Sequence, residues 1–127
     1  MTIVLPLPSP DLNPNARVYW RRLAEAKKVA RQEACLAATS RMNELGWCNP
    51  PRWKAATAQC RFFWRTNHRH DRDNAAASCK AIWDGFTDAG VWADDAGVIF
   101  LPVLMAVSAI NPRLEIDVAA VEKASVT

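Results

Sequence analysis

The sequence predicts one small α/β (α+β) domain over residues 1–127, with a mixed sheet of about four strands, a long basic N-terminal helix and a second, central helix. Three observations favour this class. Half of the 127 residues are hydrophobic, which is enough for one sizeable core. Segments of alternating polarity flank two stretches rich in helix formers. No apolar run reaches 18 residues and no signal peptide begins the chain, so we expect a cytoplasmic protein without a membrane span.

The N-terminal third is expected to contain a strand and then a long helix. Residues 2–7 alternate in polarity, and the prolines within residues 6–14 force an extended loop after them. Residues 16–45 contain good helix formers and neither proline nor glycine, until Gly46 provides a stop. The apolar side of this helix is expected to face the core and includes Trp20, Leu23, Ala30, Ala34 and Ala38.

Charge is distributed unevenly along the chain. Residues 1–72 hold 13 Lys and Arg against 5 Asp and Glu, a net charge of +8, whereas residues 73–127 hold 3 against 8, a net charge of −5. A basic region joined to an acidic one suits a protein that grips a polyanion with one surface and holds cations with another. The alternative is that the basic residues simply solvate the helix. The helix carries a rough basic stripe at Arg17, Arg21, Lys28 and Arg31.

The middle of the chain places two carboxylates just after a strand. Residues 55–65 alternate, with one face made of Ala56, Ala58, Cys60, Phe62 and Trp64. The polar loop that follows contains Asp71 and Asp73, which the strand would hold rigidly within reach of a substrate. The four cysteines are irregularly spaced without a CxxC pair, and we expect buried free thiols.

A second helix is expected over residues 75–89, with Gly90 as its stop. Asp73, Lys80 and Asp84 return to nearly the same line at 100 degrees per residue, so Lys80 is expected to face solvent. The opposite, buried side is expected to contain Ala76, Cys79, Ile82, Trp83 and Phe86. This helix could fold the Asp71–Asp73 cluster onto Asp94 and Asp95.

The C-terminal part is expected to supply a turn and two strands. Asp94 and Asp95 lie in a turn before the apolar stretch 98–107, which we interpret as a strand despite Pro102. Residues 113–118 alternate and predict a last edge strand. The tail 121–127 is expected to be frayed.

Carboxylates that converge from two segments, beside arginines and histidines, match what a hard divalent cation and a phosphodiester require. Mg²⁺ retains several waters, so two or three aspartates suffice to hold it. Lys80 would add a point charge on the phosphate, and His68 or His70 could assist proton transfer. The structural alternatives are that Asp73 caps a helix and that Asp94 makes a turn with Asp95.

The motifs RHDRDN, K-x-x-x-D-G and GVWADD, with the opening LPLPSPDLNPNARVYW and the closing RLEI, resemble the RusA family of Holliday junction resolvases, or crossover junction endodeoxyribonucleases. The resemblance covers most of the chain. It implies a RusA-like homodimer that uses Mg²⁺, or Mn²⁺, to nick four-way branched DNA symmetrically in recombination and repair. It also implies a bacterial or phage-infected cell as the setting.

Matched residue by residue, the resemblance implies metal-binding carboxylates at Asp71, Asp73 and Asp95 and a catalytic lysine at Lys80. Additional members of the site would be Asp94 and Asn74. Lys80 follows Asp73 by seven residues where the family has four, and both spacings leave the lysine on the same helix face. The candidate DNA contacts are Arg17, Arg21, Lys28, Arg31, Arg69 and Arg72.

Two other functions remain open on the sequence. A less selective nuclease for branched DNA would share the aspartates, and a non-catalytic junction-binding protein would share the basic helix. The expected partners are four-way DNA and a second copy of the chain, with no membrane and no small-molecule cofactor. The uncharged stretch 98–107 is a candidate for the dimer interface.

Overall fold

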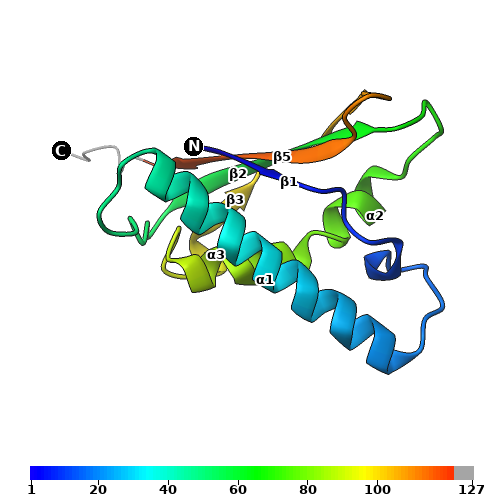
Figure 1. Ribbon diagram of the computed structural model, residues 1–127, viewed down its shortest axis with the longest axis horizontal. Helices are drawn as coiled ribbons and strands as arrows, with labels where there is room; N and C mark the ends of the chain where they lie inside the picture. The colour runs from blue at the N-terminus through cyan, green and yellow to red at the C-terminus, as the bar shows by residue number, and fades with distance from the viewer. Residues whose placement is uncertain (122–127) are drawn as a thin grey trace.

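The computed structural model describes residues 1–121, which form a five-stranded mixed sheet with helices packed on one face (Figure 1). The expected small α+β domain with a mixed sheet, a long N-terminal helix and a second helical segment is confirmed. No helix within residues 1–121 is long and apolar enough to cross a membrane. In chain order the elements are β1 (Thr2–Leu5), η1 (Pro10–Leu12), α1 (Trp20–Glu44), β2 (Ala56–Trp64), α2 (Arg72–Ala77), α3 (Lys80–Ala89), η2 (Asp95–Gly97), β3 (Val98–Phe100), β4 (Leu104–Val107) and β5 (Arg113–Ala120).

The sheet has the order β1-β5-β2-β3, and β4 pairs with the same side of β2 as β3. β5 is antiparallel to both β1 and β2, whereas β3 and β4 run parallel to β2. The expectation that residues 113–118 form an edge strand was therefore wrong. Alternation in sequence shows that a strand has one buried face, but it does not show that the N-terminal strand returns to occupy the free edge of β5.

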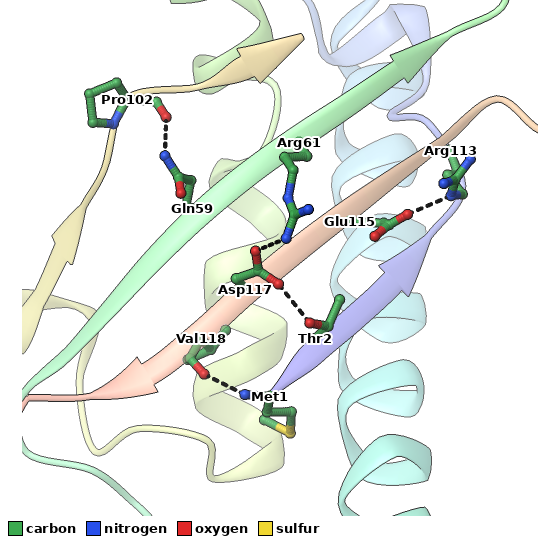
Figure 2. A network of polar contacts seen from close by, with 9 residues as sticks. All are labelled: Met1, Thr2, Gln59, Arg61, Pro102, Arg113, Glu115, Asp117 and Val118. Carbon is green, nitrogen blue, oxygen red and sulfur yellow. Dashed lines mark hydrogen bonds and ion pairs between the residues drawn. The ribbon is translucent and has the colours of Figure 1, made fainter. Parts of the chain in front are cut away.

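The apolar stretch 98–107 forms two short strands instead of the single strand expected. The ladder to β2 is interrupted around Pro102, which has no backbone N–H to donate. The Leu101 N–H donates to the Ala58 carbonyl at 2.9 Å, and the Gln59 side-chain amide donates to the Pro102 carbonyl at 3.0 Å (Figure 2). This break explains why the sheet has five strands and not four.

The long helix α1 begins at Trp20, four residues later than expected, and Arg17 therefore precedes it. Gly46 follows the helix with φ +76°, a left-handed conformation that suits glycine and confirms the expected stop. The buried residues of α1 are Ala34, Ala38 and Met42, all in its C-terminal half. Trp20 is 64% exposed, so its predicted place in the core was wrong.

The second helical segment is broken into α2 and α3 at Ser78 and Cys79. Cys79, Ile82 and Phe86 are buried as expected and Trp83 is half-buried, but Ala76 is exposed. α3 ends at Gly90, which has φ +80°.

Gly85 sets the approach of α3 to α1. A Cβ at this position would lie 2.7 Å from the Ala34 Cβ and would also meet the Arg31 carbonyl oxygen. The two helices cross closely because position 85 has no side chain.

The core lies between the helices and one face of the sheet. β2 buries Ala56, Ala58, Cys60 and Phe62 on that face, as predicted, and Trp64 is half-buried. The largest fully buried side chains come from four elements or their flanks: Ile3, Phe62, Phe86, Val91, Trp92, Leu114, Ile116 and Val118. Cys60 and Cys79 are buried as expected, Cys35 is half-buried and Cys48 is exposed.

The other face of the sheet carries a polar network that ties β1, β5 and β2 together (Figure 2). Asp117 accepts a hydrogen bond from the Thr2 hydroxyl at 2.6 Å and forms an ion pair with Arg61. The N-terminal amine donates to the Val118 carbonyl at 2.8 Å. Polar pairs of this kind suit a face that the helices leave open.

The frayed tail predicted for 121–127 falls, apart from Val121, outside the described residues.

Candidate functional site

Asp71 ends the loop that follows β2, as expected, whereas Asp73 already belongs to α2; both are exposed. Asp71 is the N-cap of α2, and its side chain accepts a hydrogen bond from the Asn74 N–H at 3.0 Å. Asp73 lies in the first turn of the helix. The capping role that the sequence allowed for Asp73 therefore belongs to Asp71.

A stack of aromatic rings stands beside this carboxylate pair. The ring centroids of Phe62 and Trp64 are 5.0 Å apart with planes inclined by 14°, and those of Trp64 and His70 are 3.8 Å apart with planes inclined by 7°. A cavity of about 320 Å³ borders the stack and is lined by Arg69, Asp71, Asn74 and residues of the N-terminal segment. Asp71, but not Asp73, thus lines a partly aromatic cavity.

Lys80 is the first residue of α3 and is exposed, as predicted. It borders a second cavity of about 360 Å³, whose other walls are mainly apolar and include Ala76, Trp83 and Phe100. Lys80 lies between the two carboxylate pairs along the chain. Lys80 is the only lysine or arginine in the segment that joins them, residues 74–93.

Asp94 and Asp95 form the second pair, immediately before β3. The Ala96 N–H donates to the Asp94 side chain at 3.1 Å and holds the pKa of that carboxyl below its usual range. The adjacent Asp94 carboxylate raises the pKa of Asp95, with a smaller contribution from Asp84. Like charges therefore face one another at this end of the site.

The two carboxylate pairs lie at opposite ends of β2. Asp71 follows the end of β2, whereas Asp95 precedes β3, whose Val98 is level with Ala56 at the start of β2. At about 3.3 Å per residue a nine-residue strand such as β2 is roughly 27 Å long. The α2–α3 segment, which runs between the pairs, keeps them apart.

Within residues 1–121 no group of three or more His, Cys, Asp or Glu side chains is arranged to hold a metal ion. The ligand set expected from the sequence, Asp71, Asp73 and Asp95, is therefore not gathered within one chain. The central helix separates the two clusters and does not fold one onto the other.

The expected basic stripe on α1 is only partly available. Arg21 and Lys28 are exposed, whereas Arg31 makes two hydrogen bonds to Asp88 at 2.6 and 2.8 Å. This pairing holds the pKa of Asp88 below its usual range. Arg17 is exposed in the segment before α1.

The remaining two predicted DNA contacts lie beside the first carboxylate pair. Arg69 and Arg72 flank Asp71 and are exposed. The basic side chains near the proposed site thus come mainly from the loop after β2 and less from α1.

The Trp64–His70 stack is the feature of the site that the sequence did not predict. The alternation along β2 predicts that Phe62 and Trp64 share one face of the strand. His70 lies six residues further on, in a loop, and no sequence pattern places a loop ring on a strand ring.

Comparison with known proteins adds one relative. No protein-family model matches this chain. An uncharacterized protein of Xylella fastidiosa (strain Temecula1 / ATCC 700964) is 34% identical over 105 residues, which cover 81% of this chain. The matched part spans 65% of the relative's length. The relative is similar over most of this chain, and its description names no activity.

Proposed function

We propose that this protein is a metal-dependent endodeoxyribonuclease of RusA-like fold that cleaves four-way DNA junctions in recombination and repair. One observation carries the proposal: Asp71, Asp73, Lys80, Asp94 and Asp95 are all exposed, and none forms a salt bridge within the described residues. Four carboxylates and an amine that folding leaves without charge partners are available to a cation and a phosphodiester. The sequence resemblance supports the same assignment.

Because the two carboxylate pairs lie at opposite ends of β2 within one chain, the proposed site requires a second copy of the chain. The outer edge of β3 and β4 pairs with no strand in residues 1–121. Along it the side chains of Ile99, Phe100, Leu104 and Val107 are about half exposed. An exposed apolar edge of this kind favours pairing with another chain. Two identical edges related by a two-fold axis pair in antiparallel orientation.

Antiparallel pairing would bring unlike ends together. The start of β3 would meet the end of β4 in the second copy, and β4 ends at Val107, which is level with Trp64 at the end of β2. Asp95 of one copy would then lie near Asp71 and Asp73 of the other. Mg²⁺ or Mn²⁺ would be held between the two copies, and each dimer would contain two such sites for the two opposed strands of a junction.

Charge complementarity supports this arrangement. The loop and helix start after β2 carry Arg65, Arg69 and Arg72, all exposed. The opposite end of the site carries three exposed carboxylates, Asp84, Asp94 and Asp95. Antiparallel pairing opposes the basic end of one copy to the acidic end of the other, which relieves the repulsion around Asp95.

The first experiment compares cleavage of a mobile four-way junction with cleavage of a linear duplex of the same sequences, in Mg²⁺ or in EDTA. We expect paired symmetric nicks on the junction alone, lost in EDTA and lost in Asp73→Asn, which should still bind. Glu25→Gln, an exposed acid on α1, is the matched control and should cut normally. Equal cutting of both substrates would indicate the less selective nuclease. Binding without nicks in any metal would indicate a non-catalytic junction-binding protein.

A mixing experiment tests whether the sites are shared between copies. Asp73→Asn and Asp95→Asn should each be inactive alone, but a mixed dimer has one site with both aspartates intact. If subunits exchange randomly, half of the dimers are mixed, and about one quarter of the wild-type sites return. Mixing Asp71→Asn with Asp73→Asn is the control and should restore nothing, because both residues belong to the same half-site. Equal inactivity of both mixtures would show that the sites are not shared.

A further inference from the structure

We infer that the half-buried His70 ring is a stacking platform for an unstacked nucleobase of the DNA strand that reaches Asp71 and Asp73. The inference rests on the proposed function, because it takes DNA as the ligand. It adds a binding site to that function, built on the rings of Trp64 and His70, which neither the metal-ligand set nor the basic stripe includes.

The platform is the outer end of a column of three rings. Phe62 is fully buried in the core, whereas Trp64 and His70 are half-buried. Successive planes are inclined by only 14° and 7°, so the rings stack face to face. Parallel stacking on Trp64, with ring centroids 3.8 Å apart, holds the His70 ring in one orientation, which a loop residue would not otherwise have.

The column ends at a cavity whose size and lining suit one base. Its volume is about 320 Å³, at the lower end of the range for small-molecule sites. Asn13 and Asn74 supply amide groups able to hydrogen-bond a base edge, and Arg69 lies at the wall, where it can contact a phosphate. The cavity also includes Asp71, which places the bound base next to the proposed scissile strand.

The ligand must be an unstacked base because bases within a duplex already cover both of their faces by stacking. Strands at the centre of a four-way junction, or single strands, offer such a face. Stacking of this kind tolerates any base, since every base has a π-face. We therefore expect the platform to act in recognising DNA structure and not DNA sequence.

The test measures how tightly the protein binds a short single strand and a mobile junction, each of which carries the fluorescent base 2-aminopurine. The measurement is made in EDTA, where no cleavage occurs. His70→Ala should weaken binding of the single strand about tenfold, within the range for loss of one stacked base, and should abolish the quenching of 2-aminopurine on binding. His70→Phe should keep both affinity and quenching. His68→Ala, an exposed neighbouring histidine, is the matched control and should behave as wild type.

His70→Leu separates stacking from folding. Leucine still covers Trp64 but has no π-face, so this variant should unfold in urea much as wild type does and yet lose the quenching. Unchanged affinity and quenching in His70→Ala and His70→Leu, with junction nicking intact in wild type, would overturn the platform alone. Loss of quenching in the two variants, in a protein that never nicks DNA, would uphold the platform and reject the nuclease.

Discussion

The two carboxylate pairs of the site are built alike but lie in opposite electrostatic surroundings. Asp71 and Asp94 each accept a backbone N–H at the start of a helical turn, at 3.0 and 3.1 Å. The first pair is flanked by exposed arginines. The second faces Asp84, and the pKa of Asp95 is raised. The comparison teaches that the first pair lies in a locally basic part of the chain and the second in a locally acidic part, so the second has the greater need of a cation or a second chain to neutralise it.

The largest expected effect comes from disturbing the segment that holds the two pairs apart. Gly85→Val would place a branched side chain against Ala34 and the Arg31 carbonyl oxygen, where even a Cβ does not fit. We expect the free energy of unfolding to fall by about 3 kcal/mol, the upper end of overpacking costs, as measured by urea denaturation. The helices would separate and the spacing between the carboxylate pairs would be lost.

Gly46→Ala is the control for this substitution. No atom lies within 4 Å of a Cβ at Gly46, so only its φ of +76° opposes a side chain. The strain should cost about 1 kcal/mol. If Gly85→Val destabilised no more than Gly46→Ala, close packing of α1 on α3 would not be what places the site.

A smaller effect separates the capping roles of the two pairs. Asp71→Ala removes the cap of α2, a helix of only six residues, and should cost about 1 kcal/mol of unfolding free energy. Asp94→Ala also removes a cap, but it relieves the repulsion with Asp95, so we expect a smaller loss. Thermal unfolding monitored by circular dichroism, with Asp71→Asn as a cap-preserving control, measures the difference. A larger loss in Asp94→Ala would contradict the electrostatic contrast.

The smallest effect concerns protonation at the second pair. In an NMR titration the pKa of Asp95 should lie above the ordinary aspartate value and that of Asp94 below it. Asp94→Asn should return the pKa of Asp95 towards its ordinary value. An Asp95 pKa that stays raised in Asp94→Asn would mean that Asp94 is not the cause.

The same shifts set the pH dependence of stability. The raised pKa of Asp95 favours the folded state below the unfolded pKa of about 3.9, and this contribution is lost as pH rises through the folded pKa. Asp88 and Asp117 have lowered pKa values, so their contributions exist above the unfolded pKa and are lost as pH falls through the folded values. Asp88→Asn should therefore reduce the fall in urea midpoint between pH 6 and pH 3.

Several elements of the fold could be predicted because their signals are local. The alternation of residues 55–65 predicted β2 and its buried face, and Gly46 and Gly90 were predicted as helix stops from conformational freedom alone. The start of α1 and the break at Ser78 were not predicted, because local composition permits a helix there and only packing decides its limits.

The sequence by itself determined which side chains could carry chemistry: exposed aspartates after a strand and before the next one, a solvent-facing Lys80, and a surplus of cations in the first half. Only the tertiary structure decided their distances. The α2–α3 segment holds Asp71 and Asp95 at opposite ends of β2, Arg31 is paired with Asp88, and His70 stacks on Trp64. Spacing along a chain specifies the face of an element. The long-range packing of helices on a sheet specifies which elements meet.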